Sequence, residues 1–368
     1  GKVDLSKQKP QSGSYDYVDS MGLISSLEKV KSNGGNIALN ISIEKSVFVK
    51  FTVESETEHQ SFDVERVFLS PDVQREKIED EFVGELFYST HSIHKTIILL
   101  GGSDGSQTGL SLMAGPLASR GFNVLTVGYF NEQGLPPKLE EIPLEYFEHV
   151  FSWLKKNPVT QGDSIYLHGT SKGGELALLL ASRYREISRV VVSSPHAYCL
   201  QALDGLMAGN NASSWSYKGK SLPFISVDNN IFYRHQKECI KKGIPFGFTS
   251  TYKTSVDMAT NKEEARIKIE NAYADFLFIA GRQDNVWNTY EACASMISAL
   301  ENNHYKYLYT LLDYEELGHS LPIPYIIPLK ETLHVDIGEG VFTCGGTLEG
   351  NSRGQADSWE KTLQFFMR

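Results

Sequence analysis

The residues best suited to chemistry lie in one short stretch, Gly162 to Leu180. Within it, Gly169 to Gly173 reads G-x-S-x-G, and flanking glycines let a backbone bend sharply around a serine. Ser164 to His168 before it has the composition of a buried strand, and Glu175 to Arg185 after it is rich in Ala and Leu like a helix. Strand, glycine-flanked serine and helix in this order are typical of a nucleophile elbow. We therefore predict that Ser171 is a nucleophile, the alternative being an ordinary glycine-rich turn.

A serine nucleophile needs a general base, and the base needs a carboxylate to orient it. In α/β-hydrolases these two residues follow the serine in the order acid, then histidine, each in a loop after a sheet strand. Asp284 directly follows the predicted strand Asp275 to Ala280, and His319 lies beyond the predicted strand Tyr305 to Leu311. The order therefore predicts a triad of Ser171, Asp284 and His319.

Other acids and histidines fit the triad less well. Asp275 begins a strand, and Asp313 lies in the wrong loop for the acid. For Asp284 itself, the alternative interpretation is a helix N-cap or a turn residue. The remaining histidines are expected to be core, surface or pocket residues; those weighed are His168, His196, His304 and His334.

Acyl transfer also needs N–H groups that stabilise an oxyanion. The Lys172 N–H at the helix start is one candidate, because the first amides of a helix have no intrahelical acceptor. The second donor is expected in the glycine-rich loop Gly101 to Ser106, from the N–H of Ser103 or Asp104. The alternative is that this loop is a flexible surface segment.

Strands and helices alternate along most of the chain and would position these residues. The predicted strands are largely apolar, as strands buried on both faces of a parallel sheet are. Besides those named above, they are Gly84 to Tyr88, Lys95 to Leu100, Asn123 to Val127 and Ser188 to Ser193. The predicted helices are Leu110 to Ser119, Leu144 to Lys156, Thr289 to Leu300 and Asp357 to Phe366. The pattern predicts an α/β fold with a mostly parallel sheet.

Two regions depart from this alternation. Residues 1 to about 80 are β-rich, with predicted strands at Asn36 to Ile43, Ser46 to Val53 and Gln60 to Leu69. Three strands would make a thin sandwich, so we expect further strands upstream of Gly1. Residues 195 to about 270 are rich in loop signals, with one charged helix predicted at Lys262 to Ala272, and are typical of a lid or substrate-pocket insertion.

Composition narrows the function classes. The 368 residues carry a formal net charge of −10, which argues against general nucleic-acid binding. Four widely separated cysteines without a CxxC pair argue against a zinc site or a disulfide framework. The sequence has no apolar run of membrane-span length and no phosphate-loop, dinucleotide or metal-ligand motif, so we expect no membrane span, metal or cofactor. Few cysteines and no leader favour the cytoplasm, although a removed leader would leave no trace.

These residues resemble the acyl-CoA thioesterase and bile acid-CoA:amino acid N-acyltransferase family. The segment Ser171 to Leu176 is similar to the family's elbow, and Phe68 to Arg75 to the junction between its two domains. Further similar segments lie along nearly the whole chain: Gly1 to Ile24, Leu135 to Pro137, Leu144 to Phe147, Tyr217 to Gly219, Leu222-Pro223, Asp284 to Trp287, Gly318-His319, Pro322 to Tyr325, Gly345-Gly346 and Asp357 to Phe366. The region 195–270 is similar only near Tyr217 to Pro223, and the loop Gly101 to Gly109 only loosely.

The resemblance implies an α/β-hydrolase domain over residues 81–368, with the insertion at about 195–270, after an incomplete N-terminal immunoglobulin-like β-sandwich over residues 1–80. It also implies that the triad acts on an acyl-CoA thioester. Conjugating members use Cys at the nucleophile position, so Ser171 indicates hydrolysis to a free acid and CoA. The CoA phosphates would meet a basic mouth drawn from Lys172, Lys218, Lys220 or Arg282, with Lys218 and Arg282 as the named candidates; the alternative is that each is a solvated surface cation.

Two other functions stay open at this stage. The same triad would serve a carboxylesterase, or a dienelactone-hydrolase-like or peptidase-like enzyme acting on an oxygen ester or amide. The third hypothesis is a non-catalytic binding protein with a vestigial hydrolase fold, and the presence of all three triad residues argues against it. The sequence indicates neither the acyl chain nor the oligomeric state.

Overall fold

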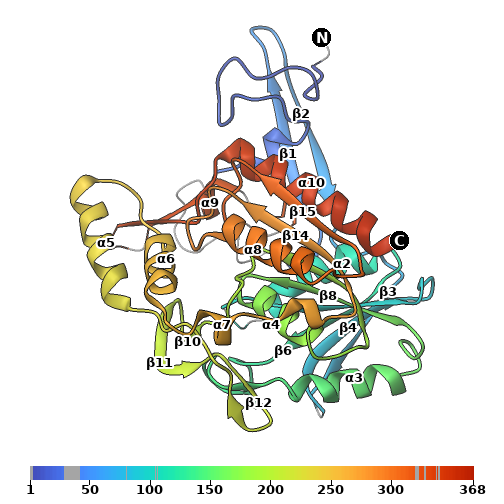
Figure 1. Cartoon of the computed structure of the whole chain (residues 1–368). Helices are drawn as coiled ribbons and strands as arrows, with labels where there is room; N and C mark the ends of the chain where they lie inside the picture. The colour runs from blue at the N-terminus through green and yellow to red at the C-terminus, as the bar shows by residue number, and fades with distance from the viewer. Residues whose placement is uncertain are drawn as a thin grey trace.

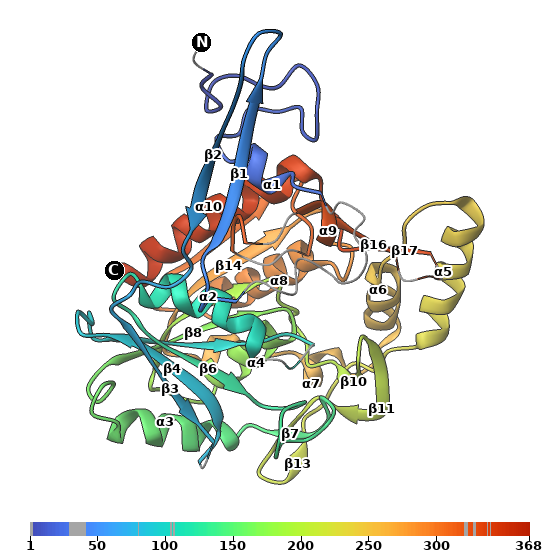
Figure 2. The ribbon, with the colours of Figure 1, turned by 180° about the vertical axis from the view of Figure 1, so that it is seen from behind.

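The computed structural model describes residues 3–28, 42–79, 81–103, 105, 107–319, 323–326, 329–336, 338 and 340–368. Its main feature is a twisted sheet with helices on both faces (Figure 1). A long hairpin projects from the body at the N-terminal side, and an insertion of strands and helices projects from another edge (Figure 2).

Eight strands form the sheet in the order β15, β14, β9, β8, β5, β6, β4, β3. In this sheet β4 runs antiparallel to both of its neighbours, and all other neighbouring pairs are parallel. The predicted α/β-hydrolase fold is therefore confirmed. The strands are β3 (Val73–Ile78), β4 (Val83–Ser89), β5 (Lys95–Leu100), β6 (Asn123–Gly128), β8 (Ser164–Thr170), β9 (Ile187–Ser193), β14 (Asp275–Gly281) and β15 (Tyr309–Tyr314).

Helices cover both faces because the central strands are apolar on both sides. One face packs against α2 (Thr108–Ala118) and α10 (Leu348–Met367), whose Leu117 and Phe366 are fully buried. The other face packs against three helices, α3 (Tyr146–Lys156), α4 (Lys172–Ala181) and α8 (Thr289–Asn302). Parallel strands end at one edge of the sheet, so the loops after β5, β8, β9, β14 and β15 meet there.

The described part of the N-terminal region contains α1 (Gly22–Ser25) and the antiparallel hairpin of β1 (Val47–Glu54) and β2 (His59–Arg66). The strand predicted at Asn36 to Ile43 lies mostly outside the described residues. β3, which precedes residue 80, pairs with β4 in the large sheet. The division of the chain at residue 80 stays a prediction.

The insertion after β9 is more structured than its loop-rich sequence predicted. Its strand β12 (Trp215–Tyr217) pairs in parallel with β7 (Ile142–Pro143), which lies outside the insertion. The other elements of the insertion are β10 (Gln201–Asp204), β11 (Met207–Ser213), β13 (Lys220–Ser221), α5 (Asn229–Lys242), α6 (Thr249–Met258), α7 (Lys262–Ala265) and the 3-10 turn η2 (Ile269–Asn271). Near the C-terminus lie α9 (Leu329–Leu333), β16 (His334–Asp336) and β17 (Val341–Thr343).

Several predicted elements differ in extent from the structure; the closing helix, predicted from Asp357, already begins at Leu348. The helix predicted over Lys262 to Ala272 is interrupted at Arg266, which is extended (φ −65°, ψ 133°) and bridges Tyr198. The Ile267 amide then bonds the Ala197 carbonyl at 3.0 Å, so tertiary pairing replaces the intrahelical bonds. The last sheet strand begins at Tyr309 rather than Tyr305.

A buried carboxylate joins the insertion to the helix after the candidate nucleophile. Glu175 on α4 is 0% exposed, and its Oε2 accepts a hydrogen bond from Lys172 Nζ at 2.6 Å. Its Oε1 accepts from the Trp215 indole N–H at 2.6 Å and from the Leu200 amide at 3.0 Å. Lys172 is itself 1% exposed, and burial lowers the pKa of its ammonium. The charges of the pair are therefore compensated, and β12 and the residue just before β10 are held against α4.

None of the described helices combines the length and the apolar character that crossing a membrane requires. The described residues also contain no group of three or more His, Cys, Asp or Glu side chains placed to hold a metal ion.

We predict that Glu175→Gln destabilises the protein by about 3–5 kcal/mol, because it leaves the Lys172 ammonium buried without a counter-charge. The additional substitution Lys172→Met removes that charge and is expected to restore most of the loss. Urea unfolding measures both variants. Asp257→Asn, which breaks the exposed pair with Lys253, is the control and is expected to leave the free energy of unfolding nearly unchanged. A double variant no more stable than Glu175→Gln would contradict the prediction.

The buried His168 in β8 makes the free energy of unfolding depend on pH. It is 2% exposed, and burial lowers its pKa from 6.5 to about 4. Below pH 6.5 His168 is protonated in the unfolded chain but stays neutral in the folded one. The free energy of unfolding therefore falls as the pH drops from 6.5 toward 4. Between pH 7 and pH 5 we expect the wild type to lose roughly 2 kcal/mol more than His168→Leu, measured by urea unfolding. Equal losses in both proteins would refute a buried neutral His168.

Candidate active site

Ser171 lies at a strained turn between β8 and α4. Its backbone angles are φ 57° and ψ −122°, which a residue with a side chain rarely adopts. Its amide donates to the Ser193 carbonyl at 2.9 Å, and its carbonyl accepts from the Gly174 amide at 2.9 Å. The conformation is thus held by the end of β9 on one side and the first turn of α4 on the other.

The glycines on either side are required by close backbone contacts. A Cβ at Gly169 would lie 2.1 Å from the Gly173 carbonyl oxygen. A Cβ at Gly173 would lie 2.2 Å from the Leu100 oxygen and 2.3 Å from the Gly101 oxygen. No side chain fits at either position: Gly169 lies against the first turn of α4, and Gly173 lies against the end of β5.

The glycine-rich loop after β5 lies against the serine. A Cβ at Gly102 would be 3.4 Å from Ser171 Cβ and 3.8 Å from Ser171 Oγ. Ser103 follows directly, whereas Asp104 lies outside the described residues. Lys172 is the first residue of α4, so its N–H has no intrahelical acceptor. This arrangement brings two sources of N–H donors to the serine, and their roles as oxyanion donors stay predictions.

Asp284 and His319 are hydrogen-bonded. Asp284 Oδ2 is 2.8 Å from His319 Nδ1, and the aspartate side chain is 1% exposed. The Asp284 Oδ1 accepts from the amides of Val286 at 2.8 Å and Trp287 at 3.2 Å, and the Thr289 hydroxyl donates to Oδ2. These donors fix the carboxylate. With Nδ1–H donating to Asp284, the Nε2 of His319 is left as the proton acceptor.

Neighbouring backbone fixes the two loops relative to each other. The Gln283 amide donates to the Leu317 carbonyl at 3.1 Å, which joins the loops after β14 and β15. The His319 amide donates to the Cys344 carbonyl at 2.8 Å. The loop that carries His319 is therefore bonded to the loop after β14 at Leu317 and to Cys344 at His319 itself.

Trp287 connects this pair to the serine side of the site. Its ring packs edge-on against His319, with centroids 5.2 Å apart and planes at 88°. Its indole N–H donates to the Ser194 carbonyl at 3.1 Å, next to the residue that binds the Ser171 amide. Among the hydrogen bonds of the described residues, one joins Asp284 to His319 and none joins His319 to Ser171.

The rival acids and the rival histidine nearest the site, His196, have other partners. Asp313 binds Arg282, with Oδ2 2.6 Å from Nη2, and Asp275 pairs with Arg189 at 3.7 Å. His196 lies close to the site, 5.6 Å from the Trp287 ring, but its Nδ1 accepts from the Tyr198 amide at 3.3 Å. Burial lowers the pKa of His196 to about 4, so its ring is neutral. The sequence reasoning missed Trp287 and Thr289, for which the only signal is their position just after Asp284.

The candidate cations differ in their availability. The expectation that the Lys172 side chain contributes to a basic mouth is wrong, because its ammonium is buried against Glu175. The Arg282 guanidinium contacts Asp313 and lies 3.7 Å from the centre of the Tyr290 ring. Lys218 is exposed, with its ammonium 5.3 Å from the Tyr217 ring. Substrate roles for Lys218 and Arg282 stay predictions.

Comparison with solved structures finds remote likenesses. A putative dienelactone hydrolase from Klebsiella pneumoniae is 12% identical with a TM-score of 0.45, over 88% of this chain and 99% of that one. An acylaminoacyl peptidase from Pyrococcus horikoshii is 13% identical with a TM-score of 0.46, over 82% of this chain and 42% of that one. The fold assignment here depends on the strand order and not on these likenesses.

Comparison with protein families and characterised sequences is more specific. Human acyl-coenzyme A thioesterase 6 is 29% identical, over 99% of this chain and 83% of that protein. Mouse acyl-coenzyme A thioesterase 1 is 28% identical, over 100% of this chain and 83% of that protein. The model of the acyl-CoA thioester hydrolase/BAAT N-terminal region matches residues 1–80, and that of the BAAT / acyl-CoA thioester hydrolase C terminal matches residues 142–368. Since the second model alone spans more than half of the sequence, the chain belongs to the BAAT / acyl-CoA thioester hydrolase family.

Proposed function

We propose that this protein hydrolyses acyl-CoA thioesters to a free fatty acid and CoA, with Ser171 as nucleophile, His319 as general base and Asp284 as the residue that orients the base. The observation that carries the proposal is the 2.8 Å hydrogen bond between Asp284 and His319. It occurs at the sheet edge that carries a strained, glycine-flanked serine, in a chain of this family. The substrate is a small molecule, and no nucleic acid takes part.

The first half-reaction transfers the acyl group to the enzyme. Ser171 Oγ attacks the thioester carbonyl while its proton moves to His319 Nε2, forming a tetrahedral oxyanion. The C–S bond then breaks, and the CoA sulfur leaves with the proton from His319. Asp284 stays ionised and stabilises the imidazolium that forms in between.

Backbone amides stabilise the oxyanion in this proposal. The Lys172 N–H and the Ser103 N–H are the two donors, with the Asp104 N–H as the alternative to the second. Gly102 supports the assignment of the second donor, because this neighbour of Ser103 lies within van der Waals distance of the Ser171 side chain.

Water completes the cycle. His319 removes a proton from a water molecule that attacks the acyl ester on Ser171, and the same proton then returns to Ser171 Oγ as the fatty acid leaves. A serine nucleophile forms an oxygen ester here, which favours hydrolysis over transfer to an amino acid. For the CoA phosphates we propose Lys218 and Arg282, of which Lys218 is the more available because two carboxylates already surround Arg282.

For the cellular location we propose the cytoplasm. Among the relatives, human acyl-coenzyme A thioesterase 2 is named mitochondrial.

We predict that a fluorophosphonate probe labels the wild type and fails to label Ser171→Ala. Ser193→Ala is the matched control, because Ser193 is a buried neighbour that contributes only its backbone carbonyl to the elbow. Asp284→Asn is expected to lower kcat by about 10⁴-fold, since it favours the wrong tautomer of His319. Equal labelling of the wild type and Ser171→Ala would exclude Ser171 as the nucleophile, whereas a wild type that is not labelled would favour a non-catalytic binding protein.

The substrate class is tested by measuring kcat/KM for acyl-CoA and for p-nitrophenyl esters of the same acyl chains. We expect acyl-CoA turnover that Ser171→Ala abolishes. Efficient ester cleavage with no acyl-CoA cleavage would instead favour a carboxylesterase. An amide substrate cleaved in preference to both would favour a peptidase-like enzyme.

A further inference from the structure

Thr289, the first residue of α8, has a buried hydroxyl that binds the candidate acid. The residue is 0% exposed, and its hydroxyl donates to Asp284 Oδ2. His319 Nδ1 lies 2.8 Å from the same oxygen. The two amides that bind this carboxylate, those of Val286 and Trp287, both reach Oδ1. Among the described residues, Thr289 is therefore the one donor that shares an oxygen with the candidate base.

The donors to the two carboxylate oxygens come from different elements. The amides of Val286 and Trp287 follow Asp284 by two and three positions, so they form a local turn that ties Oδ1 to its own loop. The Thr289 hydroxyl instead fixes Oδ2 from the start of a helix. A carboxylate bonded at both oxygens is restricted in its rotation about the Cβ–Cγ bond. Oδ2 therefore stays directed at His319.

The start of α8 does not use the Thr289 hydroxyl as a cap. Ser and Thr stabilise helix starts when they occupy the N-cap and accept a backbone N–H there. The N-cap of α8 is Asn288, whose side chain makes no cap hydrogen bond, and Thr289 lies one position further in. A carboxylate only accepts hydrogen bonds, so the hydroxyl is the donor to Asp284. The hydroxyl thus serves the candidate acid and not the helix.

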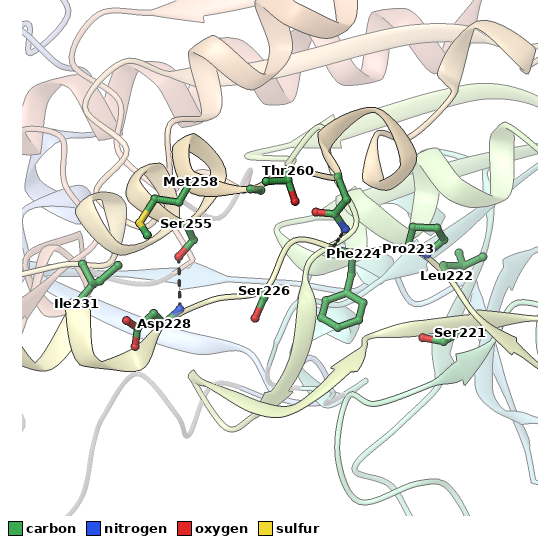
Figure 3. A pocket seen from close by; sticks show the side chains of 12 residues that line it. Ser221, Leu222, Pro223, Phe224, Ser226, Asp228, Ile231, Ser255, Met258 and Thr260 are labelled. Carbon is green, nitrogen blue, oxygen red and sulfur yellow. Dashed lines mark hydrogen bonds between the residues drawn. The ribbon is translucent and has the colours of Figure 1, made fainter.

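Two other buried hydroxyls have partners outside the candidate site. In the hollow between the β13–α5 loop and α6, Ser255 Oγ accepts from the Asp228 amide at 3.4 Å (Figure 3). At the sheet edge where β5 and β8 begin, the Thr96 hydroxyl donates to Asp163 Oδ2 at 2.7 Å. Thr96 is also 0% exposed, and the exposed His94 lies 3.4 Å from Asp163 Oδ1. This second pair reproduces the bond between threonine and aspartate away from the candidate nucleophile.

We propose that Thr289 is a positioning residue: through Asp284 it holds the His319 imidazole in the orientation that accepts the serine proton. The inference rests on the proposed function and adds a residue to the three that carry it. Thr289 reaches the reacting atoms only through Asp284, so its loss acts on kcat and not on substrate binding. Since a hydrogen bond to a charged group is at stake, we expect kcat to fall roughly tenfold to a hundredfold.

Steady-state kinetics with palmitoyl-CoA and p-nitrophenyl butyrate test this. Thr289→Val removes the hydroxyl and keeps the shape of the side chain, and it is expected to lower kcat while KM changes by about twofold at most. Thr289→Ser keeps a hydroxyl and is expected to restore most of the wild-type kcat. Thr96→Val is the matched control, because it removes the same kind of buried bond at the other sheet edge.

The control separates positioning from stability. We expect Thr96→Val to lower the free energy of unfolding about as much as Thr289→Val does, measured by urea unfolding, and to leave kcat unchanged. Equal losses of kcat in the two Val variants would overturn the proposal. An unchanged kcat in Thr289→Val, or a loss that Thr289→Ser does not relieve, would overturn it as well.

A second measurement does not depend on the substrate. The rate at which a fluorophosphonate labels Ser171 requires the base but neither CoA nor an acyl chain. We expect Thr289→Val to be labelled about tenfold more slowly than Thr96→Val. If this slowing occurs while the wild type hydrolyses no acyl-CoA, the thioesterase function fails and the role of Thr289 stands. If acyl-CoA is hydrolysed and both variants are labelled equally fast, the role of Thr289 fails alone. A wild type that is neither labelled nor active refutes both.

Discussion

The close packing of the elbow against the end of β5 is the constraint on which the rest of the site depends. Gly169 and Gly173 approach carbonyl oxygens so closely that a Cβ at either position would lie little more than 2 Å from one of them. Ser171 is forced into a left-handed conformation between them, and Ser193 holds its amide. Because α4 begins at once after the serine, the same packing aims the helix N-terminus and the loop at Gly102 toward Ser171 Oγ. The strained serine is thus held by the end of β9 and the first turn of α4, which itself packs against the end of β5 through Gly173.

A second set of contacts, made by buried polar side chains, positions the insertion. Glu175 lies one turn along α4 from the serine and accepts hydrogen bonds from Lys172, Trp215 and Leu200. A half-satisfied carboxylate there would be costly, whereas a fully satisfied one specifies a single arrangement of the insertion. The position of the insertion relative to Ser171 therefore depends on Glu175 as well as on backbone packing.

Sequence reasoning reached the sheet and the order of the candidate residues because both depend on local patterns. Apolar runs such as Lys95 to Leu100 indicate buried strands, and Asp284 and His319 follow strands that end at one sheet edge. The structure accordingly brings those two side chains into hydrogen-bond contact. The short strands of the insertion could not be predicted from local patterns, because they pair with residues far away in the sequence, as Trp215 does with Ile142. Lys172 was misjudged for the same reason: its burial depends on Trp215, more than forty residues later.

Trp287 connects the elbow side of the site to the general base and to the insertion. Its indole N–H is bound to the Ser194 carbonyl, its edge supports the His319 ring, and its other side packs against Tyr252 of α6. A single side chain therefore lies against the general base on one side and against α6 on the other. Because aromatic packing tolerates little displacement, α6 cannot move relative to the sheet without disturbing His319. In the proposed enzyme, a displacement of α6 is therefore transmitted to the general base through Tyr252 and this tryptophan.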